Sequence, residues 1–134
     1  MLRLAGCVLL DNKKRILLLH SNKHGRVQWE LPGGKVDEGE NEEKAAVREL
    51  NEELGVRVEI IRKLGSTKFQ GFDRLCQYVW FLAEVKGHDH PHILEPQTFD
   101  ALNYFSLDEL DSMQLSPNMV KLLAALRAGT VNLG

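Results

Sequence analysis

Three glutamates within five residues form the most chemically suggestive group in this chain. They are Glu49, Glu52 and Glu53, and the segment around them has the pattern of a helix. At about 100° per residue, the three side chains fall within an arc of roughly 100°. Like charges at this spacing repel one another, so a hard divalent cation with oxygen ligands would compensate them. A solvated acidic face is the alternative interpretation.

The residues before and within this segment favour the metal interpretation. Pro32, Gly33 and Gly34 form a turn in which paired glycines let the backbone approach a phosphate or a metal ion closely. Lys35 adds a positive charge beside the turn. Arg48 lies four residues before Glu52, a spacing that allows a supporting ion pair. The pattern therefore predicts metal and phosphate chemistry where the turn meets the helix.

The segment 34–56 resembles the Nudix box, G-x5-E-x7-R-E-U-x-E-E-x-G-U, in which U is a bulky aliphatic residue. Every fixed position is filled without a gap, by Gly34, Glu40, Arg48, Glu49, Leu50, Glu52, Glu53, Gly55 and Val56. Residues 29–33 (WELPG) are similar to the segment that usually precedes the box. On these residues the chain is identified as a member of the Nudix hydrolase family, of the MutT-like kind.

The resemblance implies a fold and a site. The implied fold is an α/β/α sandwich around a central mixed β-sheet, with the box as a loop–helix–loop. The implied reaction is Mg²⁺-dependent hydrolysis, with Mn²⁺ as a substitute, of a nucleoside diphosphate linked to another group. By position, the metal ligands would be Gly34 through its carbonyl, Glu49, Glu52 and Glu53. Glu52, Glu53 and Arg48 would be catalytic, with Arg48 orienting a box carboxylate. Glu40 would join the metal network or be structural, and Lys35 would contact phosphate.

The substrate is less narrowly indicated. ADP-ribose hydrolases of the family often carry a proline some fifteen residues beyond the box, and dinucleoside polyphosphate hydrolases a tyrosine. The segment 69–72 (FQGF) has neither, and Tyr78 is too far along. The default is a nucleoside triphosphate pyrophosphohydrolase, with Phe69 and Phe72 as substrate-binding candidates. ADP-ribose, nucleotide-sugar and dinucleoside polyphosphate hydrolysis remain alternatives. A nucleotide-sensing module without catalysis is a remote one, because the box glutamates are intact.

A carboxylate outside the box is also expected to take part, because the family often recruits one from the loop before a late strand. Glu95 is the candidate, since Pro96 restricts its backbone to extended conformations. Asp100 is the alternative acid in the same loop. We interpret His20 and His24 as ordinary loop residues rather than substrate contacts. The segment 88–92 (HDHPH) is interpreted as a solvated loop rather than a metal cluster, because no Cys or HExxH pattern supports it.

The elements that position these residues follow from periodicity and caps. The patterns predict strands over 3–10 and 15–20 that pair as a hairpin, further strands over 56–61, 74–85 and 101–105, and a looser stretch over 65–73. They predict helices over 42–54 and 117–128. The first helix has Asn41 as N-cap and Gly55 after its end, and the second has Ser116, Pro117 and Gly129 in the corresponding roles. This order predicts a mixed sheet between helices.

Length and composition limit the other possibilities. The chain has 134 residues and a net charge of −2, which fits one domain over 1–134 and argues against a dedicated nucleic-acid binder. Its apolar runs are shorter than the roughly 20 residues that cross a membrane, and no secretory signal is apparent. Cys7 and Cys76 are expected to be buried thiols in a reducing, cytoplasmic compartment. A small nucleotide is the expected partner, with a homodimer possible and no nucleic-acid polymer or membrane.

Overall fold

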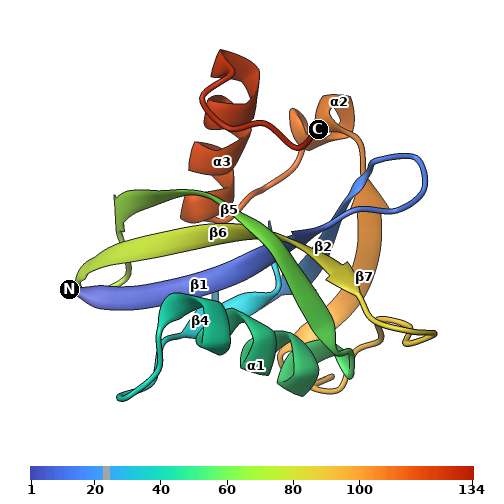
Figure 1. The fold of residues 1–134 in the computed structure, drawn as a ribbon. Helices are drawn as coiled ribbons and strands as arrows, with labels where there is room; N and C mark the ends of the chain where they lie inside the picture. The colour runs from blue at the N-terminus through green and yellow to red at the C-terminus, as the bar shows by residue number, and fades with distance from the viewer. Residues whose placement is uncertain (23–24) are drawn as a thin grey trace.

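The computed structural model describes residues 1–22 and 25–134. Figure 1 shows the elements along the chain. The strands are β1 (Leu2–Leu9), β2 (Ile16–Ser21), β3 (Gln28–Glu30), β4 (Gly33–Lys35), β5 (Val58–Gln70), β6 (Leu75–Val85) and β7 (Phe99–Phe105). The helices are α1 (Glu42–Leu54), α2 (Leu107–Leu110) and α3 (Pro117–Ala128).

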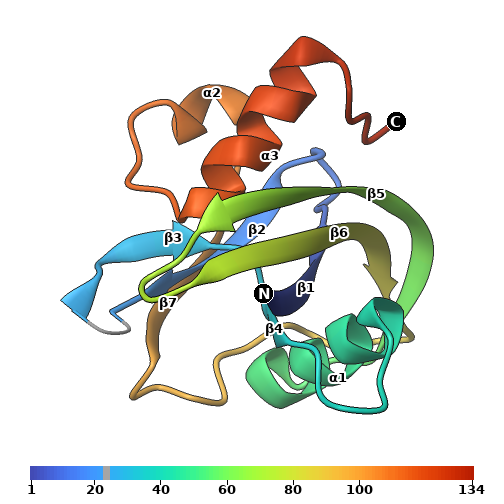
Figure 2. The same ribbon diagram turned by 90° about the vertical axis from the view of Figure 1, so that its left-hand side faces the viewer.

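The strands form two sheets. The larger is mixed, in the order β4-β1-β6-β5, with β1 parallel to β6 and the other neighbours antiparallel. The smaller is antiparallel, in the order β3-β2-β7. One buried cluster joins α1 to the sheets, and a second lies under α2 and α3. The mixed sheet therefore lies between helices, as Figures 1 and 2 show, and the predicted fold class is confirmed.

The predicted hairpin between the first two strands is wrong. β1 pairs with β4 and β6, whereas β2 pairs with β3 and β7. A single bridge between Leu10 and Ile16 is what connects the two strands. Both strands are buried along most of their length, so each needs partners on both edges, and each obtains them as the central strand of a different sheet region.

The predicted looser stretch after Gly65 is also wrong as far as Gln70. β5 continues through it as the antiparallel partner of β6, with register shifts near Ile60 and Lys63. This edge strand is mostly exposed, so it lacks the regular apolar alternation that marks a half-buried strand. The β5–β6 hairpin ends close to Phe72, which places this residue at the tip of a long two-stranded arm.

Helix α1 begins and ends where its caps predict. The Asn41 side chain accepts a hydrogen bond from the Lys44 N–H at 2.8 Å. Gly55 ends the helix in the left-handed conformation, with φ of 67°. The face formed by Ala45, Ala46, Leu50 and Leu54 is fully buried against the core. Burying this face fixes the rotation of the helix, and the glutamates are carried toward β4 by that rotation.

Candidate active site

The turn that starts β4 lies directly against two box glutamates. Glu53 is 4% exposed, and its carboxylate accepts a hydrogen bond from the Gly33 N–H at 2.9 Å. The Glu49 carboxylate packs on Gly34, where an added Cβ atom would lie 2.5 Å from the Glu49 carboxyl carbon. A side chain at position 34 would therefore push this carboxylate away. The glycine turn and the acidic face of the helix therefore meet, as the sequence predicts.

Arg48 connects the loop before α1 to the helix itself. Its guanidinium donates to both Glu40 oxygens at 2.8 and 2.9 Å, and to the Lys35 carbonyl at 2.9 Å. It also donates to Glu49 at 3.0 Å and to Glu52 at 3.2 Å. The hydrogen bonds from Arg48 lower the pKa of Glu40 to about 2, and those carboxylates raise the pKa of Arg48. Glu40 therefore stays ionised at neutral pH and holds the guanidinium in place.

The donor set fits a hard divalent cation, although the carboxylates do not surround one point in this structure. Within residues 1–22 and 25–134, no three His, Cys, Asp or Glu side chains are placed so that they could hold a metal ion. Arg48 instead engages Glu49 and Glu52, and Glu53 faces the Gly33 N–H. The three box glutamates offer carboxylate oxygens as metal ligands. Glu49 also lies against Gly34, whose carbonyl oxygen is the further candidate ligand. Side-chain rotation of Glu49 and Glu52 away from Arg48 would be required.

A cavity of about 260 Å³ opens beside the same turn. Gly33 and Gly34 form part of its wall, together with Phe69 and Phe72. These two aromatic residues are the predicted substrate-binding candidates, and the structure brings them together here. The remaining lining residues include Leu4, Arg26, Gln28, Glu30, Leu31, Gly71, Tyr78, Ser116, Pro117 and Asn118. The glycine turn thus forms one end of the cavity, and the box carboxylates of α1 contact the same turn.

Several residues of this cavity were missed by sequence reasoning. Asn118 is 6% exposed, its Oδ1 accepts from the Trp80 Nε1–H at 3.4 Å, and its Nδ2 donates to Ser116 at 3.3 Å. The available signal is a polar residue in the first turn of a mostly apolar helix. The Arg26 guanidinium lies 5.4 Å from the centre of the Phe72 ring, across the cavity mouth. Phe72 is 73% exposed at this rim.

The loop before β7 packs against the end of α1 and carries Glu95. The Leu94 N–H donates to the Glu53 carbonyl at 3.1 Å, so the residue before Glu95 contacts the helix that holds the box. The Glu95 carbonyl accepts from Thr98 and Phe99, which forms a turn at this point. Asp100, the alternative acid, instead pairs with His20, with 2.5 Å between Oδ1 and Nδ1. His24 lies outside the described residues.

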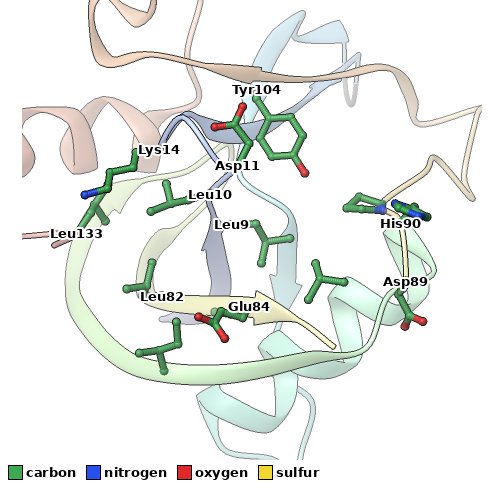
Figure 3. Close-up of a pocket in the computed structure, with 14 residues that line it drawn as sticks. Leu9, Leu10, Asp11, Lys14, Leu82, Glu84, Asp89, His90, Tyr104 and Leu133 are labelled. Atoms are coloured by element: carbon green, nitrogen blue, oxygen red, sulfur yellow. The ribbon is translucent and has the colours of Figure 1, made fainter. Parts of the chain in front are cut away.

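A larger cavity of about 610 Å³ lies away from the box, between the ends of the two sheets. Figure 3 looks into it, with Lys14 and Leu133 on one side and Asp89 and His90 on the other. No described box residue lines it. Asp11 is neutralised by Arg15 at 2.7 Å, and Asp89 by Arg57 at 3.0 Å. We place the candidate active site at the smaller cavity, because that one adjoins the acidic helix.

Comparison with known proteins identifies the family. A family model described as a NUDIX domain matches residues 2–126, so the chain belongs to the Nudix family. The oxidized purine nucleoside triphosphate hydrolase of Mus musculus is 34% identical over 87% of this chain and 74% of its own length. The RNA pyrophosphohydrolase of Shewanella frigidimarina is 33% identical over 54% of this chain. This chain spans about half the length of that relative, 51%.

The solved structures support the same family. The crystal structure of a MutT NUDIX hydrolase from Burkholderia pseudomallei superposes with a TM-score of 0.83 at 29% identity, covering 93% of this chain and 97% of that one. The two named relatives are a nucleoside triphosphate hydrolase and an RNA pyrophosphohydrolase, which supports the expectation of an enzyme that hydrolyses pyrophosphate bonds. Across the described residues, no helix is long and apolar enough to cross a membrane.

Proposed function

We propose that this protein hydrolyses a nucleoside triphosphate to the monophosphate and pyrophosphate, with Mg²⁺ as its metal. One observation carries the proposal: a cavity with aromatic walls opens onto the Gly33–Gly34 turn, and the box carboxylates contact that same turn. A nucleotide needs such an arrangement, because its base must be bound at one end while its phosphate chain reaches the metal at the other. The mouse relative's name, which specifies nucleoside triphosphates, adds support.

Each site residue has a role in this proposal. Glu49, Glu52, Glu53 and the Gly34 carbonyl would hold Mg²⁺ or Mn²⁺, which neutralises phosphate charge and lowers the pKa of bound water. Arg48 holds the box loop to α1 through Glu40 and the Lys35 carbonyl. Lys35, whose side chain is exposed, would contact phosphate oxygens. Phe69 and Phe72 would pack against the base.

The reaction itself requires only water as the second reactant. The water oxygen forms a bond to phosphorus as the bridging phosphorus–oxygen bond breaks. The electron pair of that bond leaves with pyrophosphate, and a carboxylate accepts the proton that the water loses. Glu53 and Glu95 are the candidates for this base: Glu53 is nearly buried at the turn, and Glu95 follows a residue bonded to the Glu53 carbonyl. We also propose that the protein works in the reducing cytoplasm, because its two cysteines are buried thiols that form no disulfide.

The test compares Glu53→Gln with the wild type in a product-resolved assay with Mg²⁺. The substitution removes one negative charge at nearly constant shape, and kcat is expected to fall at least ~10²-fold, about 2.7 kcal/mol at the transition state. Glu43→Gln, an exposed glutamate in the first turn of the same helix, is the matched control and should retain wild-type kcat. Near-wild-type turnover by a folded Glu53→Gln protein would contradict the assignment.

The assay also separates the candidate substrates. The panel contains nucleoside triphosphates, ADP-ribose, a dinucleoside tetraphosphate, a nucleotide sugar and a 5′-triphosphorylated oligoribonucleotide, since one relative is an RNA pyrophosphohydrolase by name. In ¹⁸O-labelled water, the label should appear in a phosphate product, with pyrophosphate as the second product of a triphosphate. Release of single phosphates in sequence, or higher kcat/KM for the oligoribonucleotide, would overturn the triphosphate assignment.

A further inference from the structure

Tyr78 lies across the floor of the candidate nucleotide cavity. It belongs to β6, where it pairs with Leu4 of β1, and its side chain is 4% exposed. The ring extends over β1 toward β4, because a methyl group added at Gly6 would overlap the Tyr78 hydroxyl oxygen, and one added at Gly33 would lie 2.5 Å from it. The hydroxyl therefore lies over Gly6 of β1, with Gly33 beside it. Position 6 has no room for a side chain, because the Tyr78 ring crosses it.

Among residues 1–22 and 25–134, no residue forms a hydrogen bond with the Tyr78 hydroxyl group. In the same part of the chain, no fully buried side-chain nitrogen or oxygen lacks a partner. The hydroxyl oxygen must therefore keep a small contact with solvent, and the cavity that Tyr78 lines is where it can do so. The Tyr78 hydroxyl is thus a nearly buried donor that is available to a ligand in the cavity.

This donor keeps its proton at neutral pH. Burial raises the pKa of Tyr78 well above its usual value, and the negative charges of Glu53 and Glu30 raise it further. A bound carbonyl oxygen would accept from the hydroxyl and satisfy it. An amino group would instead donate to the hydroxyl oxygen, which leaves the buried O–H proton without an acceptor. The two kinds of ligand differ by one unmade hydrogen bond.

We propose that Tyr78 is a specificity-determining residue whose hydroxyl donates to the base, so that 6-oxopurine and 4-oxopyrimidine nucleotides bind better than their amino counterparts. The inference rests on the proposed function, because it takes the cavity to be the base site. One unmade hydrogen bond corresponds to about a five- to tenfold difference in KM. The difference belongs in KM rather than kcat, because the base does not change during hydrolysis of the phosphate chain.

The experiment measures KM and kcat for two keto–amino pairs, ITP with ATP and UTP with CTP. The wild type should favour ITP and UTP about five- to tenfold in KM. Tyr78→Phe should raise KM for ITP and UTP by that factor, with kcat and the KM values for ATP and CTP within about twofold, so that the preference disappears. Tyr104→Phe makes the same chemical change at a tyrosine that lines the other cavity, and it should leave all four KM values unchanged.

Thermal unfolding separates this role from a structural one. Because the hydroxyl has no partner within the described protein, Tyr78→Phe should leave the unfolding midpoint within about 2 °C or raise it. A clear loss of stability, no keto preference in the wild type, or an equal change in KM for all four nucleotides would overturn the inference. The wild-type preference alone decides the matter if the variant does not fold.

Failure of the proposed function gives a different result. If the wild type hydrolyses no triphosphate, that function is overturned, and calorimetric binding of IMP and AMP without metal then tests Tyr78 directly. Tighter binding of IMP than of AMP, lost in Tyr78→Phe, would support the inference on its own. Equal affinities, or no binding of either monophosphate, would overturn it together with the proposed function.

Discussion

Arg48 shows which part of a residue's environment is visible in a sequence. Its ion pair with Glu52 follows from their spacing on one helix and is present at 3.2 Å. Its bonds to Glu40 and to the Lys35 carbonyl depend on how the loop folds back, which no local spacing determines. The box pattern named these residues through family resemblance. Their hydrogen bonds explain why a guanidinium suits this position, since one planar group reaches several acceptors at once.

We propose Glu95, rather than Asp100, as the acid that acts from outside the box. Asp100 is held by His20, whereas Glu95 follows directly after a residue that is bonded to the end of α1. Glu95→Gln is expected to lower kcat about 10²-fold in the hydrolysis assay, because a positioned general base contributes about that much. Asp100→Asn is the matched comparison and should retain kcat within a few-fold. A kinetically silent Glu95→Gln protein would instead leave proton transfer to the box carboxylates.

The end of α1 is more tightly fixed than the end of α3. Both helices end at a glycine in the left-handed conformation, Gly55 with φ of 67° and Gly129 with φ of 77°. A Cβ atom at Gly129 would meet nothing within 4 Å, whereas one at Gly55 would lie 2.6 Å from the His92 ring. His92 is itself bonded through its N–H to the Leu54 carbonyl. Gly55 is therefore constrained by its conformation and by a neighbouring side chain.

These two glycines give a matched pair of substitutions. Gly129→Ala is expected to destabilise the protein by about 1 kcal/mol, the cost of the left-handed conformation alone. Gly55→Ala is expected to cost more, about 2 kcal/mol, because the His92 ring must also move. Urea unfolding monitored by tryptophan fluorescence measures both values. Equal losses for the two variants would show that His92 yields freely and does not fix the helix end.

Helix ends could be predicted from the sequence, but strand partners could not. Asn41 and Gly55 mark the limits of α1 through local chemistry, and the observed limits coincide with the predicted ones. The hairpin prediction failed because pairing depends on which edges a strand must bury, a property of the assembled sheets. The same limit applies to Tyr78 and Asn118, which come together only in a cavity that the β5–β6 arm, β1 and α3 line together.

At the scale of the whole molecule, a surface ion pair connects the end of α1 to the loop after β6. Arg57, just after α1, pairs with Asp89 in the loop after β6, and the hydrogen bonds from Arg57 lower the pKa of Asp89 to about 2. Because this pKa is depressed in the folded state, the stabilisation is fully present above the unfolded value of about 3.9. It is lost as the pH falls toward the folded value.

Asp89→Asn is therefore expected to lower the urea midpoint at pH 7 and to have progressively less effect between about pH 4 and pH 2. Arg57→Gln removes the other half of the pair and should show the same dependence on pH. The measurement is a series of urea unfolding curves for the wild type and both variants across this range. A difference from the wild type that persists undiminished at pH 2 would mean that the pair is not its source.

The parallel pairing of β1 with β6 has a consequence for how the protein is made. β1 lies at the start of the chain, yet Leu4 must pair with Tyr78 and Gly6 with Trp80. β1, which pairs with both β4 and β6, thus leaves the ribosome long before β6 has been synthesised. Long-range pairing of this kind slows folding and leaves apolar segments exposed meanwhile. A nascent chain can form α1 early, but neither the turn nor the cavity can be completed until β6 has been synthesised.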